Sequence, residues 1–217
     1  MTDIVSRAGL WTMAHTERAA LAADLAGLDE AQWRHRSLCG DWVVEDVVAH
    51  LTAGASLGRG RWLLSVLRAG FDFDKHNSRQ LARHRGATPA ETLARFRAVV
   101  DSTTAPSGHT AAWLGEVVVH GQDIRQPLGL ASAPAPAAVT EVARFYAARD
   151  FTVAGKTLIE GLRLEATDGP FAVGSGPLVT GTTIALTMVM AGRAGYCAEL
   201  TGPGVASVRA RMSTPAP

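Results

Sequence analysis

The chain has 217 residues, of which 47% are hydrophobic and 19% are charged, so it is long enough to bury a sizeable core and to form two modest domains. Its 21 basic and 20 acidic residues leave a net charge of +1, which argues against nucleic acid or an anionic membrane as a partner. The first residues lack the order of a signal peptide and no apolar run approaches the roughly 20 residues that span a bilayer, so we expect a cytoplasmic protein.

Two amphipathic helices are predicted at the start of the chain. In residues 4–27, apolar side chains recur at helical spacing and Gly27 is placed to end the helix. The segment "VVEDVVAHLTAG" (43–54) places Val47, His50 and Leu51 on one stripe and two acidic residues in the first turn. His50 is therefore expected to face the interior.

Helical patterns continue to about residue 148. A helix is predicted over 62–69, and the polar segment "DFDKHNSRQLARHRG" that follows fits either a loop or a helix. The "TPAE" sequence at 88–91 has the spacing of a capping box and begins another helix. The segment "WLGEVVVHGQDIRQPLG" (113–129) predicts a helix that ends near its proline and last glycine. A Pro/Ala connector then leads to a helix over 139–148.

The last third of the sequence has a different pattern. From Gly161 apolar and polar residues alternate, and Asp168 with Gly169 offers a hairpin turn between two strands. The segments "TTIALTMVMAG" and "GPGVASVRARM" predict two further helices. We therefore expect an α+β protein with a helical domain over residues 1–152 and a small α/β domain over 153–217.

Glu116 and His120 lie one turn apart on the helix predicted over 113–129, so their side chains point the same way. Such a pair is more often a simple Glu/His contact than part of a metal site. His50 alone is likewise more often a core histidine with a hydrogen-bond partner than a ligand. Together, however, two imidazoles and a carboxylate from two facing helices suit zinc with an open fourth position.

Other candidate groups have more than one reading. Asp123 either orients a ligand from behind, caps its helix, or pairs with Arg125. Cys39 either lines the pocket or is a small buried thiol, and the latter is the commoner case. The two cysteines, Cys39 and Cys197, form no CxxC motif, which suits a reducing compartment.

Two segments resemble the signature sequences of the maleylpyruvate isomerase family of mycothiol-dependent enzymes, whose N-terminal domain is DinB-like. These segments are "SLCGDWVVEDVVAHL" (37–51) and "GEVVVHGQDIRQPLG" (115–129), and their order and spacing also agree. The segments "GLRLEATDGPFAVGSGP", "GTTIALTMVMAGR" and "ELTGPGVASVRARM" are similar to the family's sterol-carrier-like C-terminal domain. The resemblance covers most of the chain. It departs at Val43, where many relatives have a capping Thr or Ser.

The resemblance implies a DinB-like four-helix bundle in which His50, Glu116 and His120 hold a divalent metal, most simply zinc. It implies mycothiol as the thiol cosubstrate and a small electrophile as its partner, with a metal-bound thiolate attacking that electrophile in cis-trans isomerisation or S-transfer. His76 and Asn77 fall where DinB-like proteins often have polar pocket residues. Arg193 is the candidate for binding an acidic substrate or the thiol, although an arginine there also pairs with helix carbonyls.

Three alternatives to a thiol-dependent enzyme stay open at this point. The chain could be a non-catalytic protein that binds a metal or small ligand, because a fold does not establish turnover. It could be a metal-dependent hydrolase with water at the open position. A helical module that binds a partner protein would need no metal at all.

Overall fold

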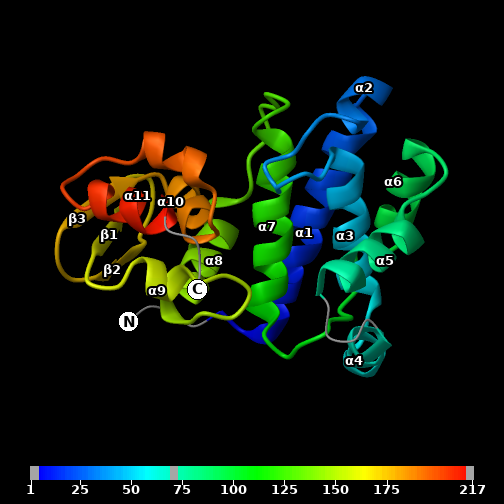
Figure 1. The fold of residues 1–217 in the computed structure, drawn as a ribbon, viewed down its shortest axis with the longest axis horizontal. Coiled ribbons are helices and arrows are strands. Elements are labelled where there is room, and N and C mark those ends of the chain that lie inside the picture. The colour runs from blue at the N-terminus through cyan, green and yellow to red at the C-terminus, as the bar shows by residue number, and fades with distance from the viewer. Residues whose placement is uncertain (1–4, 69–72, 214–217) are drawn as a thin grey trace. The chain divides into compact units, whose positions relative to one another are not determined.

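The computed structural model describes residues 5–68 and 73–213, without the side chains at 62, 65, 66, 68 and 73–77, and its chain divides into two compact units, Met1–Pro134 and Ala135–Pro217 (Figure 1). Seven helices form the first unit within the described residues: α1 (Arg7–Ala26), α2 (Glu30–Trp33), α3 (Val44–Ser56), α4 (Arg59–Arg68), α5 (Phe73–His84), α6 (Pro89–Arg97) and α7 (Thr110–Arg125). The polar segment that fitted either a loop or a helix contains the whole of α5.

A four-helix bundle makes up the core of the first unit. Helix α1 packs against α7, α7 against α3, α3 against α6, and α6 against α1, which closes a ring. Each helix contributes a fully buried apolar side chain: Leu21, Val44, Phe96 and Leu114. The bundle brings α3 and α7, which carry the candidate ligands, into contact although they are far apart in sequence.

The start of α6 has the predicted side-chain cap, whereas at the start of α3 a different residue makes the capping contact. Thr88 Oγ1 accepts a hydrogen bond from the Glu91 backbone N–H at 3.2 Å, as the "TPAE" sequence predicts. At α3, Val43 offers no side-chain cap, but Asp46 Oδ2 accepts from the Val43 backbone N–H at 3.2 Å. This contact is half of a capping box and satisfies one of the free donors at the helix start.

The second unit combines five helical segments with a three-stranded sheet. Its elements are α8 (Pro136–Ala148), α9 (Gly155–Leu158), β1 (Arg163–Ala166), β2 (Ala172–Gly174), β3 (Leu178–Gly181), α10 (Thr183–Met190), η1 (Ala194–Glu199) and α11 (Val205–Ser213). The strand order is β2-β1-β3, with β1 antiparallel to β2 and parallel to β3. Leu164 pairs with Val173 on one side and Val179 on the other.

The link from β2 to β3 crosses the end of β1 and depends on two glycines. Gly174 and Gly176 have positive φ angles of 77° and 123°. A Cβ atom on either would lie 2.2 Å from a backbone oxygen, that of Leu162 or Gly161. Only glycine tolerates both the backbone conformation and this close approach, so the two residues fix the crossover that places β3 beside β1.

The α+β class predicted from the sequence is confirmed, and the unit boundary lies earlier than the expected 152/153. Helix α8 packs against α10 and α9, so it belongs with the second unit by its contacts. Among the described residues, no helix combines the length and apolar character needed to cross a bilayer.

Candidate metal centre

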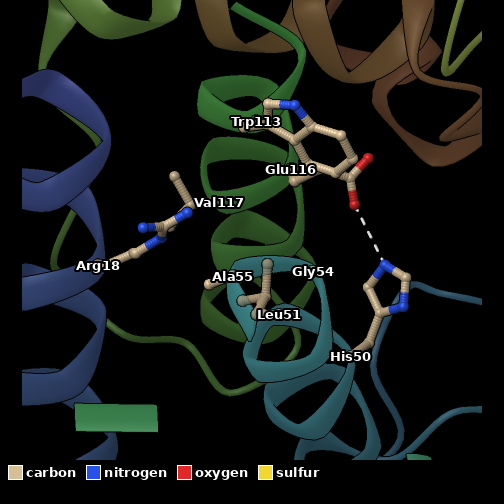
Figure 2. A pocket seen from close by; sticks show the side chains of 8 residues that line it. All are labelled: Arg18, His50, Leu51, Gly54, Ala55, Trp113, Glu116 and Val117. Atoms are coloured by element: carbon tan, nitrogen blue, oxygen red, sulfur yellow. Dashed lines mark hydrogen bonds and ion pairs between the residues drawn. The ribbon is translucent and has the colours of Figure 1, made fainter. Parts of the chain in front are cut away.

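The structure brings together the three side chains that the sequence proposed as metal ligands. His50 comes from α3, and Glu116 and His120 come from one face of α7. Glu116 Oε2 lies 3.1 Å from His50 Nε2 and 3.4 Å from His120 Nε2 (Figure 2 shows the former pair). One ligand atom from each residue lies within 4.8 Å of the other two. We call these three residues the triad.

Asp123 fixes the orientation of the His120 ring. Its side chain is fully buried, and its Oδ2 lies 2.9 Å from His120 Nδ1. When Nδ1 donates its hydrogen to this carboxylate, the lone pair of the neutral ring is left on Nε2, which faces Glu116. A carboxylate behind a histidine in this way is typical of histidines that bind metals.

A tight loop at residues 37–42 holds the start of α3 against α7. The Leu38 backbone N–H donates to the backbone carbonyl of Asp123 at 3.1 Å. Ser37 Oγ donates to the Trp42 carbonyl at 2.8 Å and accepts from the Cys39 N–H at 3.1 Å. Gly40, with a φ of 58°, permits the turn between them. The loop therefore places its side chains beside the triad.

Two of those side chains contact the histidines. The Trp42 ring lies 5.0 Å from the His50 ring and 6.5 Å from the His120 ring, centroid to centroid. The Cys39 thiol makes a side-chain hydrogen bond with His120. The sequence offered Cys39 as a pocket residue or a buried thiol, and the structure places it half-buried against a triad histidine.

The electrostatics of the triad favour a cation. Burial opposes ionisation of Glu116, but hydrogen bonds and charge from His120 and His50 outweigh it and hold the pKa of this carboxyl well below its usual value. Burial also disfavours a charged His120, yet its hydrogen bonds with Asp123, Cys39 and Glu116 raise its pKa well above the usual value. In the metal-free protein a proton on His120 thus supplies the positive charge that a bound metal would bring.

A narrow pocket of about 10 Å³, close to the space of one water molecule, adjoins the triad. His50, Glu116, Trp113 and Arg18 are among its lining residues (Figure 2). Arg18 comes from α1 and is 5% exposed, and its Nη1 donates to the Ser102 carbonyl at 2.7 Å. Burial lowers the pKa of Arg18 to about 10, so it remains charged at neutral pH. Arg18 was not among the residues proposed from the sequence, although a charged residue between Ala14 and Leu21 on the apolar stripe of α1 was a signal for it.

Arg193, His76 and Asn77, the other candidates from the sequence, are not among the residues that the structure shows at the triad. Arg193 belongs to the second unit, immediately before η1, where its Nη1 donates to the Ala191 carbonyl at 2.6 Å. This contact is the helix-carbonyl pairing that the sequence offered as the alternative to substrate binding. His76 and Asn77 lie in α5, but their side chains fall outside the described part of the structure.

The fold and site define a class: a helical-bundle protein with a two-histidine, one-carboxylate candidate metal centre and an appended α/β unit. Residues 14–107 match the family model described as the mycothiol maleylpyruvate isomerase N-terminal domain. No curated protein matches the chain in sequence.

Two solved structures share the fold over nearly the whole chain. One is a crystal structure of the mycothiol-dependent maleylpyruvate isomerase, with 16% sequence identity and a TM-score of 0.61. The other is a histidine-to-alanine mutant of that enzyme, with 15% identity and a TM-score of 0.60. Each alignment covers 98% of this chain and 96% of the other chain. At such identities the likeness establishes the fold, including the appended α/β unit.

Proposed function

We propose that this chain is a mycothiol-dependent enzyme that acts on a small electrophile, as a cis-trans isomerase of the maleylpyruvate type or as a thiol S-transferase. The convergence of His50, Glu116 and His120 within 4.8 Å, in a chain whose residues 14–107 match the family model named for this activity, carries the proposal. In this proposal the triad holds a divalent metal, most simply zinc.

The donor set fits such a metal. Two imidazoles and one carboxylate are a common set for zinc centres that keep an open position for a reactant. The carboxyl ionises readily, and Asp123 accepts the Nδ1 hydrogen of His120, so Nε2 offers its lone pair once a cation displaces the second proton of the ring. When bound, a divalent cation at this place would stabilise the thiolate form of a coordinated thiol.

The chain's own residues have distinct parts in this proposal. Asp123 keeps the His120 ring turned towards the triad, and Trp42 covers both histidine rings on one side and limits access of water. Arg193 is our candidate for binding the acidic part of the substrate or of the thiol, because a guanidinium binds a carboxylate through two parallel hydrogen bonds. His76 and Asn77 are proposed pocket residues on α5.

Isomerisation and transfer differ in what happens to the thiol. In isomerisation the thiolate adds to a conjugated cis double bond, the adduct rotates about the resulting single bond, and elimination returns the thiolate with the trans product. In transfer the carbon–sulfur bond is kept and the thiol is consumed. Free thiol measured against product therefore separates the two reactions.

The experiment that tests the proposal is turnover of maleylpyruvate by metal-loaded protein with and without mycothiol. We expect turnover only with the thiol, and its loss in Glu116→Gln. Turnover that does not depend on thiol would favour a metal-dependent hydrolase instead. Metal binding without turnover of any electrophile would favour a non-catalytic binding protein. Arg193→Lys and Arg193→Met then test the substrate contact, with a rise in KM expected to be larger for the methionine.

A further inference from the structure

A second group of potential metal ligands lies next to the triad and shares one residue with it. Cys39 Sγ, a ring nitrogen of His120 and a carboxylate oxygen of Asp123 all lie within 4.8 Å of one another. Neither Cys39 nor Asp123 is needed as a ligand by the triad. The described part of the chain holds two such groups, and this one alone contains a thiol.

The position of Cys39 is built into the local fold. Its backbone N–H donates to Ser37 Oγ at 3.1 Å, and its carbonyl accepts from the Trp42 N–H at 3.1 Å. The neighbouring Leu38 N–H is bonded to the backbone carbonyl of Asp123 itself. The sulfur and the carboxylate are therefore held close by main-chain contacts that do not depend on either side chain.

We propose that Cys39, His120 and Asp123 form a second metal-binding position, selective for a soft divalent cation such as Cd²⁺ or Zn²⁺. A thiolate with an imidazole and a carboxylate suits these ions, and thiolate is the donor that the triad lacks. The cation uses Nδ1 of His120 and takes the place of the proton now shared with Asp123. A tetrahedral ion with bonds of about 2.1 Å holds two donors roughly 3.4 Å apart. The present 2.9 Å between Nδ1 and Oδ2 needs only a small opening.

The two positions exclude one another in this account. The triad uses Nε2 of His120 and needs the hydrogen on Nδ1, whereas the second position uses Nδ1 and needs the hydrogen on Nε2. A neutral imidazole has only one free lone pair, so one ring serves one metal at a time. The choice between the two positions then follows the softness of the ion, because a softer ion favours the position with the sulfur donor. The inference does not rest on the proposed function, because it needs neither an external thiol nor turnover.

The test is a Cd²⁺ titration of metal-free protein in the absence of any added thiol, followed by the ultraviolet charge-transfer band between thiolate and cadmium. We expect the band in the native protein, in Cys197→Ser, and in His50→Ala, which removes a triad ligand alone. Cys39→Ser should lose it. No band in the native protein, or a band that persists in Cys39→Ser, would overturn the second position.

A second measurement on native protein guards against a misfolded Cys39→Ser. Cd²⁺ should slow alkylation of Cys39 by at least about tenfold, because a coordinated thiolate is a poor nucleophile towards the reagent. Alkylation of Cys197, buried in the other unit, should not change. Unchanged alkylation of Cys39 at saturating Cd²⁺ would refute the proposal. If, in a Cys39→Ser background, His50→Ala and Glu116→Gln leave zinc content unaltered while the cadmium band of the native protein behaves as expected, the proposed triad fails and the second position stands.

Discussion

Replacing Asp123 by asparagine should weaken metal binding at the triad without disturbing the fold. Asp123 is fully buried, and its Oδ2 lies 2.9 Å from Nδ1 of His120. Asparagine keeps the shape and one acceptor oxygen, but it removes the negative charge that makes His120 a stronger donor. The Leu38 N–H is bonded to the backbone carbonyl of Asp123, so the substitution leaves that loop contact in place.

The expected loss of metal affinity depends on whether the variant keeps an acceptor for the Nδ1 hydrogen of His120. Loss of a group that orients a metal-binding histidine costs roughly 10- to 100-fold in affinity, or about 1.4 to 2.8 kcal/mol. Asp123→Asn should fall near the lower end, because an acceptor for the Nδ1 hydrogen remains. Asp123→Ala should fall near the upper end, because the ring then loses its only described carboxylate partner on that side.

The assay is competition for Zn²⁺ between the protein and a chromophoric chelator at neutral pH. The variants are compared in a Cys39→Ser background, so that only the triad binds the ion. Asp101→Asn, at an exposed site, is the matched control and should bind as the parent does. Affinity of Asp123→Asn and Asp123→Ala within about threefold of the parent would refute the orienting role.

The remaining predictions concern stability. In metal-free protein the raised pKa of His120 adds stability that is complete below pH 6.5 and declines as the pH rises towards the folded-state pKa. The lowered pKa of Glu116 adds stability that is present above pH 4.5 and is lost on acidification. Urea unfolding with a chelator should show this decline above pH 6.5, and His120→Gln should abolish it; an unchanged slope would count against the pairing. Gly174→Ala should cost at least about 2 kcal/mol of unfolding free energy, because it combines a positive φ with a backbone clash. The control Gly161→Ala, where φ is 69° and no atom lies near the new Cβ, should cost only about 1 kcal/mol. Equal losses in the two variants would contradict the clash. Arg18→Met should cost about 1 to 3 kcal/mol in chemical unfolding, because the Ser102 carbonyl loses a charged donor; an unaltered midpoint would argue against that role.

Helical periodicity placed the three triad residues on the inner faces of two helices, and the family resemblance implied that they converge. Glu116 and His120 are four residues apart on one helix, and His50 lies on the apolar stripe of another, so a bundle that packs these two faces brings them together. The sequence also indicated where α6 begins and where the β1–β2 turn falls. These features depend on local signals that a single segment carries.

Features that depend on distant contacts were not predictable in this way. Arg18 lies on the apolar stripe of α1 with Ala14 and Leu21, but only the packing of α1 beside the turn after α6 shows that it reaches the partly buried carbonyl of Ser102. The contact of Cys39 with His120 depends on a loop whose path is set by Gly40 and by a bond to α7. The unit boundary falls at the Pro/Ala connector before α8 because α8 finds its packing partner, α10, farther along the chain.

The central claim is that three side chains on α3 and α7 hold one metal ion. Metal analysis of Cys39→Ser protein purified without chelators, compared with His50→Ala, Glu116→Ala and His120→Ala in the same background, tests it most directly, because only the triad can then bind the ion. We predict about one zinc per Cys39→Ser chain and a sharp loss in each further variant whose fold is intact by circular dichroism. Equal metal content in all four proteins would contradict the account.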